Sequence, residues 1–545
     1  MSSILGVNLA SFAEQSKEAR QYLSQLASIY CGDGIAFEFA HLTTAEEVRW
    51  FEKQVEANSS SSSSSSTELA RSLLEAEAFD HFLAKKFQSV KRYGGEGAET
   101  MITFVEELVR CCALAELSEL VIGMPHRGRL NLLVNTLKVP PEVLFRKMTG
   151  RNEYERRSES FIGDVLSHIY TSELLSAAGS DSDKPLQVTL LPNPSHLEVV
   201  DTVACGYARG RLMDRREGPY DHEAAKLGEK NEQSHQLNYC RLPLQIHGDA
   251  SVSGQGICME TLALANVDHW SVGGSVHLVV NNQVGYTTPG RYGQARSSPH
   301  CTDLVKMINA PVIHVSGWRP DAVVRAARLA AAYRQHFQKD IAVNLLCFRR
   351  WGHNELDDPG FTNPRLYKAI AAYQQEHQSI PQEYAKSIGL PKAAIDDIVQ
   401  SYSAQLTDAL ARVEQFTPAP VSTLYQNPNQ AKNSNQSSPW VNVGWPEANR
   451  ITKWRTGGLP SELLKRLARL SVSVPENGSG FNLHPTLKRV FGERIKKVEA
   501  ERTPGMDWAT VESLAFASLL WQGYDVRISG QDVGRGKSAV LLSEI

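Results

Sequence analysis

The chain has 545 residues, of which 42% are hydrophobic, and its formal net charge at pH 7 is −3. This length predicts two or three domains, and the hydrophobic content is sufficient for a sizeable buried core. The near-neutral charge provides no basic field for nucleic acid, and no apolar run is long enough to form a membrane helix. The eight cysteines show no metal-binding spacing, which indicates a reducing compartment with thiols used as small apolar residues.

The first ninety residues are expected to be mainly helical. Apolar residues recur at helical spacing in 19–29 and 46–55, and a third helix is expected over 68–87. The eight serines from Ser59 to Ser66 have no apolar face, so we expect a solvated loop there. The first twenty residues mix acidic and basic side chains, so they do not look like an arginine-rich transit peptide.

Strands and helices alternate between residues 91 and 403. Strands are predicted at 119–122, 187–191, 244–246, 276–280, 312–315 and 342–348. Helices are predicted at 98–115, 197–211, 255–265 and 321–337, with a turn before the third of them. Such alternation is typical of the α/β class, in which a parallel sheet is flanked by helices.

The C-terminal part of the chain is expected to contain a linker and the start of another domain. Residues 404–460 are polar and rich in Asn and Pro, which favours a linker on the surface. A helix at 508–522 and a strand at 526–529 indicate the beginning of a second α/β domain. The predicted organisation is therefore 1–90 helical with the serine-rich loop, 91–403 α/β, 404–460 linker and 461–545 incomplete α/β.

Two predicted strands end in polar residues that suit a metal ion and a diphosphate. The segment His247-Gly248-Asp249-Ala250-Ser251 follows the strand at 244–246, and Asn281-Asn282-Gln283-Val284 follows the strand at 276–280. Ligands of open parallel sheets bind outside the carboxyl ends of the strands. Carboxylate and amide oxygens suit Mg²⁺, which usually shares its coordination with phosphates. The alternative is that these residues only form turns.

This pair of segments resembles the metal-diphosphate motif of thiamine diphosphate enzymes, with Ala250 where the family usually has Gly. Longer segments extend the resemblance: Gly123 to Asn131, Leu191 to Glu198 and Arg349 to Glu355. Together they resemble the thiamine-dependent decarboxylating subunit of the 2-oxoglutarate dehydrogenase complex. The segments Lys91 to Glu99 and Gly163 to His168 look most similar to the 2-oxoadipate dehydrogenase branch, and the resemblance covers roughly residues 23–536.

The resemblance implies thiamine diphosphate and Mg²⁺ as cofactors. It implies Asp249 and Asn282 as side-chain ligands of Mg²⁺, with the main-chain carbonyl of Val284 as a third ligand. The implied cofactor-binding residues are His247, Gly248, Asp249, Ala250, Ser251 and Asn282. On its own sequence position, His247 is equally compatible with a buried core histidine.

The resemblance also implies a set of catalytic residues: His126, Arg129, His168, Ser172 and His196. Histidine suits acid–base chemistry near neutrality, because its unperturbed pKa is about 6.5. If residues 168–172 are helical, His168 and Ser172 share one face. His196 is expected to start a helix, where free N–H groups favour anions.

Each of these residues also has a structural interpretation. His126 and Arg129 are compatible with a loop histidine and a surface arginine, and Ser195 with a helix cap beside a turn-orienting His196. His353 to Glu355 is expected to be a structural loop with an ion pair to Arg349 or Arg350.

The expected activity is oxidative decarboxylation of 2-oxoadipate or 2-oxoglutarate, in the tricarboxylic acid cycle or in lysine and tryptophan degradation. The resemblance implies acyl transfer to lipoamide on an acyltransferase, a complex with dihydrolipoamide dehydrogenase, a homodimer and the mitochondrial matrix. It ends near Gly536, before the glutamate and further histidine of the family's second domain. This chain alone is therefore expected to be inactive. The alternative is a non-catalytic chain that binds the cofactor weakly or pairs with a full-length subunit.

Overall fold

The computed structural model describes most of the chain, and it divides into two units, Met1–Val441 and Asn442–Ile545. The described residues are 17–32, 34–57, 66–153, 165–175, 185–193, 195–214, 239–267, 270–286, 288, 296–417, 458–473, 485–500, 506–526 and 528. Most of the serine tract and residues 418–457 of the expected linker lie outside these ranges, so those two expectations stay predictions.

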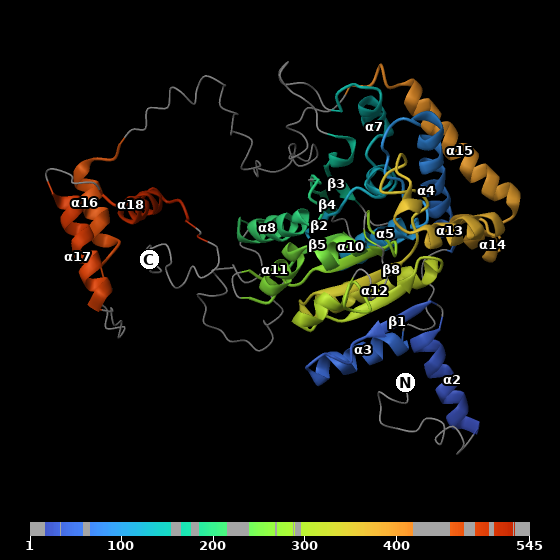
Figure 1. Ribbon diagram of the computed structural model, residues 1–545, viewed down its shortest axis with the longest axis horizontal. Helices are drawn as coiled ribbons and strands as arrows, with labels where there is room; N and C mark the ends of the chain where they lie inside the picture. Colours follow the sequence, from blue (N-terminus) through green and yellow to red (C-terminus); the bar gives the residue numbers. More distant parts are fainter. Residues whose placement is uncertain are drawn as a thin grey trace. The chain divides into compact units, whose positions relative to one another are not determined.

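The first unit is built on an eight-stranded sheet with the order β1-β7-β8-β6-β5-β2-β4-β3 (Figure 1). The strands are β1 (Ile35–Glu38), β2 (Glu119–Gly123), β3 (Thr171–Leu175), β4 (Leu186–Leu190), β5 (Arg241–Gly248), β6 (Val276–Asn281), β7 (Val312–Ser316) and β8 (Ile341–Leu346). The six inner strands are parallel and confirm the six predicted strands. The short edge strands β1 and β3 pair antiparallel and were not predicted.

Helices cover both faces of this sheet. The helical elements of the first unit are α2 (Lys17–Cys31), α3 (Ala45–Ala57), α4 (Ser66–Lys86), α5 (Thr100–Leu114), α6 (Arg129–Asn131), η1 (Leu132–Thr136), α7 (Pro141–Met148), η2 (Leu166–His168), α8 (Val199–Asp214), α10 (Asp249–Gly254), α11 (Gly256–Leu264), η4 (Asp303–Ile308), α12 (Pro320–Phe337), η5 (Pro359–Phe361), α13 (Pro364–Glu376), α14 (Ile380–Ser387) and α15 (Lys392–Ala411). The helices predicted around 98–115, 197–211, 255–265 and 321–337 are confirmed as α5, α8, α11 and α12.

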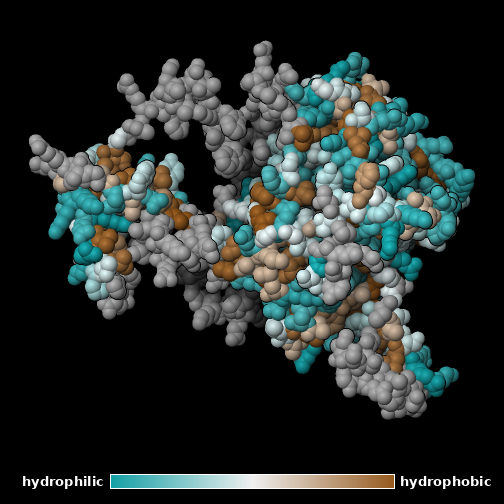
Figure 2. All heavy atoms as spheres, in the orientation of Figure 1, coloured by the Kyte–Doolittle hydropathy of each residue, from teal (hydrophilic) through white to brown (hydrophobic). Residues whose placement is uncertain are grey.

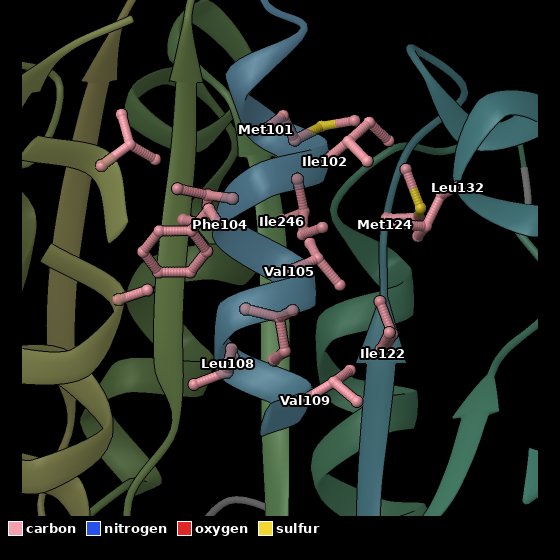
Figure 3. Close-up of a cluster of buried hydrophobic side chains, with 14 of the residues drawn as sticks. Met101, Ile102, Phe104, Val105, Leu108, Val109, Ile122, Met124, Leu132 and Ile246 are labelled. Carbon is pink, nitrogen blue, oxygen red and sulfur yellow. The ribbon is translucent and has the colours of Figure 1, made fainter. Parts of the chain in front are cut away.

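The alternation of side chains along the strands explains the two layers. Val105 and Val109 of α5 lie in the main core with Ile246 of β5 and Ile122 of β2 (Figure 3). Val121, the residue before Ile122, belongs instead to a smaller cluster formed with α8. Each inner strand therefore buries both of its faces, as expected for a parallel sheet between helices.

Three expectations about element boundaries were wrong. The helix α10 begins directly after β5, where a turn was expected, so Asp249 is the first residue of a helix. The helix α15 runs through residue 403, so the expected linker cannot begin at residue 404. Ser66, the last serine of the tract, is already the first residue of α4.

The described part of the second unit consists of the helices α16 (Ser461–Leu470), α17 (Pro485–Glu499) and α18 (Trp508–Trp521). Leu467, Ala468 and Leu514 form the small core between α16 and α18. The helix α18 confirms the helix predicted at 508–522. Of the strand expected at 526–529, only residues 526 and 528 are described, and neither is in a strand.

The surface hydropathy and the cysteine environments are those expected from the composition. The face shown in Figure 2 is mainly hydrophilic, with hydrophobic residues in small groups. Among the described helices, none combines the length and the apolar character that a membrane crossing requires. Seven described cysteines are free, and burial raises the pKa of six of them, namely Cys111, Cys112, Cys205, Cys258, Cys301 and Cys347.

Candidate active site

The carboxyl ends of the parallel strands bring four polar segments to one edge of the sheet. His126 follows β2, Asp249 follows β5, Asn282 follows β6 and Arg349 follows β8. The main-chain N–H of Asn282 donates a hydrogen bond to Asp249 Oδ1 at 3.2 Å, which joins the two halves of the predicted metal motif. The charge of Arg349 acts on both Asp249 and His126. Three of the four residues, His126, Asp249 and Asn282, are candidates from the sequence analysis, whereas Arg349 was expected only as an ion-pair partner of a structural loop.

Asp249 has the environment of a ligand for a cation. Its side chain is 1% exposed, and its Oδ2 atom has no hydrogen-bond partner among the described residues. Burial raises the pKa of this carboxyl group to about 6, although the Asn282 N–H and nearby Arg296 act in the opposite direction. A buried carboxylate with an unpartnered oxygen is costly unless another group neutralises it.

The second half of the motif supplies further oxygen atoms. Asn282 is buried, and its side-chain oxygen faces only the Cys347 thiol, with Sγ at 3.7 Å. Gln283 has a left-handed backbone with φ of 62°, which reverses the chain between Asn282 and buried Val284. A carboxylate, an amide and a main-chain carbonyl are the oxygen donors that Mg²⁺ prefers. These residues therefore fit the metal that the sequence analysis implied.

The two halves of the motif approach each other closely at Gly285. A Cβ atom at this position would lie 2.7 Å from the Cβ of Ala250, so a larger residue would push the segments apart. Ser251, on the same helix as Ala250, has its hydroxyl group engaged by Glu198 and by the carbonyl of Gly248 at 3.1 Å. Gly248 and Ala250 thus shape the backbone of the site, while Ser251 connects it to Glu198.

His247 lies in a buried network that occupies both of its ring nitrogens, and its role as a cofactor contact stays a prediction. Its Nδ1 atom is 2.7 Å from Glu198 Oε2 and 3.3 Å from Asp201 Oδ2. Its Nε2 atom is 3.1 Å from Nδ1 of His277, which in turn contacts Asp340. Burial alone would lower the pKa of His247, but the two carboxylates outweigh it and raise the pKa to about 10. Both ring nitrogens have protein partners, as the core alternative expects.

His126 lies beside a hollow lined by aromatic rings and an arginine. Its ring centroid is 4.3 Å from that of Tyr93 and 4.6 Å from that of His353, and Tyr286 stands 4.6 Å from His353. The hollow is lined by Tyr93, His126, Arg349 and His353, among other residues. Burial first, and then the charges of His353 and Arg349, lower the pKa of His126 to about 3. His126 is therefore neutral at physiological pH.

The loop after β8 needed correction in two respects. His353, interpreted as part of a structural loop, belongs to the His126 hollow. Glu355 does not pair with Arg349 or Arg350, because it lies 4.0 Å from Arg92 Nε and accepts hydrogen bonds from the N–H groups of Arg92 and Gly94. These partners are more than 250 residues away in sequence, so no local pattern could have identified them.

Arg129 is buried and is not among the residues that line the hollow, and its role as a catalytic residue stays a prediction. Its side chain is 0% exposed. Its guanidinium donates to the carbonyls of Ile169 at 2.7 and 3.0 Å, of Leu191 at 2.5 Å and of Met124 at 3.3 Å. These bonds tie together the ends of β2 and β4 and the segment before β3. In this structure Arg129 therefore holds these segments together.

The remaining candidates are divided between the site and the sheet. His168 Nε2 is 3.5 Å from Ser195 Oγ, and the charge of His168 acts on His126, so these segments converge. Ser172 lies on β3, not on a helix, and its hydroxyl bonds Thr189 at 2.7 Å and Gln187 at 2.9 Å. His196 is exposed in the turn before α8, and its carbonyl accepts from Val199 N at 3.1 Å.

Comparison with known proteins shows which family the chain resembles. Residues 109–422 match the model of the family described as dehydrogenase E1 component. The 2-oxoadipate dehydrogenase complex component E1 of Mus musculus is 44% identical over 536 residues, which are 97% of this chain and 54% of the relative. The 2-oxoglutarate dehydrogenase E1 component of Cupriavidus necator is 36% identical over 528 residues, which are 96% of this chain and 50% of the relative. The chain thus spans about half the length of the curated relatives it matches.

Proposed function

Because the chain belongs to the dehydrogenase E1 component family, we propose that the protein oxidatively decarboxylates a 2-oxo dicarboxylic acid, either 2-oxoadipate or 2-oxoglutarate. The observation that carries this proposal is the pair formed by Asp249 and Asn282. At the carboxyl edge of a parallel sheet, the main-chain N–H of Asn282 bonds Asp249, whose second carboxylate oxygen has no partner among the described residues. This is where a magnesium ion and the diphosphate of thiamine diphosphate would be held.

The chemistry is divided between the cofactor and the chain. Thiamine diphosphate, when bound, supplies the electron sink that amino-acid side chains lack. Asp249, Asn282 and the carbonyl of Val284 would hold Mg²⁺. Neutral His126 is available to donate a hydrogen bond or to accept a proton, and Tyr93 packs against its ring and restricts water.

The proposal extends to partners and location. The relatives from Mus musculus and Homo sapiens are named as components of a complex. We propose that this protein likewise works as a homodimer in the mitochondrial matrix. It would pass the acyl group to a lipoyl-bearing acyltransferase that dihydrolipoamide dehydrogenase then reoxidises. Pull-down of the chain with a lipoylated domain tests the first of these contacts.

Asp249→Asn tests the metal-diphosphate site directly. Removing the charged ligand should weaken Mg²⁺-dependent binding of thiamine diphosphate at least about 100-fold, measured by calorimetric titration into this chain. Asp303→Asn is the matched control, because Asp303 also lies in the first turn of a helical segment but pairs with Lys306. Equal affinity of the Asp249→Asn variant and the unmodified chain would remove Asp249 from the metal site. A parallel decarboxylation assay with 2-oxoadipate separates binding from turnover.

A further inference from the structure

Arg349, at the edge of the His126 hollow, has no counter-ion among the residues that the structure describes. It is partly buried, it lines the hollow, and its Nε atom is buried without a hydrogen-bond partner. Within the described ranges, no carboxylate lies within ion-pair distance of its guanidinium group. A desolvated guanidinium that lacks partners is costly, and it is a strong receptor for an anion.

The neighbouring arginines each have protein partners, which Arg349 lacks among the described residues. Arg350, the next residue, pairs with Glu96 at 3.1 Å. Arg127 donates to the carbonyls of Glu96 at 2.9 Å and Phe348 at 2.7 Å. Arg92 is engaged by Glu355. Arg127 lines the same hollow and also has a buried Nε atom without a partner, but its terminal nitrogen is held by these two carbonyls, whereas no hydrogen bond to a described residue holds the guanidinium of Arg349.

We propose that Arg349 binds the carboxylate that the substrate retains after decarboxylation, with His353 beside it. This inference rests on the proposed function and names the group that selects dicarboxylic substrates. A planar guanidinium fits a carboxylate through two parallel hydrogen bonds. The rings of Tyr93 and His126 line the same hollow and would pack against the methylene chain.

A permanent cation suits the retained carboxylate better than the one that is lost. An ion pair to the departing carboxylate would stabilise the ground state and raise the barrier to its loss. A contact with the distal carboxylate is the same before and after the reaction, so it improves binding without slowing the chemistry. The anionic alternative is the diphosphate, because the charges of Arg349 and of Arg296 both act on Asp249.

The test uses two anions that cannot react. Calorimetric titration of the chain with adipate or glutarate reports the carboxylate site, and titration with inorganic pyrophosphate and Mg²⁺ reports the diphosphate site. Arg349→Gln should weaken dicarboxylate binding at least about 10-fold and leave pyrophosphate binding unchanged, whereas Arg349→Lys should retain part of the affinity. The monocarboxylate butyrate should bind the unmodified chain more weakly than glutarate does.

Arg350→Gln is the matched control, since it removes the adjacent arginine that already has a protein partner. It should leave both affinities unchanged. Unaltered glutarate binding by Arg349→Gln, or absence of saturable dicarboxylate binding to the unmodified chain, would overturn the proposal. Loss of pyrophosphate binding to the same extent would assign Arg349 to the diphosphate instead. Failure of the proposed function is distinguishable, because it removes pyrophosphate binding from the unmodified chain.

Discussion

Two histidines at the same edge of the sheet have opposite environments. His247, at the end of β5, has a carboxylate at one ring nitrogen and a second histidine at the other, and its pKa is raised to about 10. His126, after the adjacent strand β2, packs against aromatic rings beside an arginine, and its pKa is lowered to about 3. A position near the site is thus a poor guide to the role of a histidine, because both ring nitrogens of His247 already have protein partners.

The same contrast separates the arginines. Arg129 gives its hydrogen bonds to three main-chain carbonyls and has no exposed surface. Arg349 keeps its donors for the hollow. A saturated polar group holds the architecture of the edge, and an unsaturated one marks where a ligand is received. The following substitutions test this division.

His247→Gln should cause the largest loss of stability. It leaves Glu198 and Asp201 buried without their cation, which should lower the free energy of unfolding by about 3–5 kcal/mol. His126→Gln removes a histidine that has no such buried acids beside it, and it should lower the free energy of unfolding by less than about 1 kcal/mol. Urea denaturation at pH 7 measures both. Equal stability of the two variants would break the comparison and would mean that the two acids share a proton without help from the histidine.

Arg129→Met should have an intermediate effect. The carbonyls of Met124, Ile169 and Leu191 lose their donor, and we expect a loss of about 1–3 kcal/mol in the free energy of unfolding. Arg349→Met should leave thermal stability unchanged or raise it, because no protein partner is abandoned. An Arg129→Met variant that melts normally but no longer binds glutarate would restore Arg129 to the substrate site.

His126→Asn should have the smallest effect, visible in the pH dependence of stability. The folded state keeps His126 neutral down to a pKa of about 3, while the unfolded chain takes up a proton near 6.5. The contribution of His126 is therefore fully present above pH 6.5 and is lost as the pH falls toward 3. Between pH 7 and pH 5, the melting temperature of the variant should fall by less than that of the unmodified chain. An identical loss would mean that His126 is protonated in the folded state.

The sequence predicted features whose causes are local. The six inner strands follow from short apolar runs, and Asp249 and Asn282 could be placed because each directly follows one of them. The edge strands were missed for the same reason. The strand β1 has only four residues inside a region of helical spacing, and β3 contains a polar Ser172 and Glu173.

The roles of the charged side chains depend on distant partners, so the sequence could not reveal them. Arg129 bonds carbonyls 40 and 62 residues away, and His247 contacts an acid 49 residues before it. The turn from His126 to Arg129 was expected at the edge of the sheet where a ligand binds, and the structure places it directly after β2. It could not indicate that Arg129 would give its hydrogen bonds to main-chain carbonyls. Nor could the sequence after β8 indicate that Arg349 would lack such partners among the described residues.

The reactivity of the buried cysteine thiols can report local opening of the structure around them. Alkylating reagents attack the thiolate, and burial raises the pKa of Cys258, Cys301 and Cys347 well above neutrality. Cys347 lies directly behind Asn282, and Cys258 lies on α11 beside the Glu198 network. The rate at which iodoacetamide modifies these positions therefore follows local breathing of the cofactor edge, and a bound diphosphate that stiffens this edge would slow the labelling.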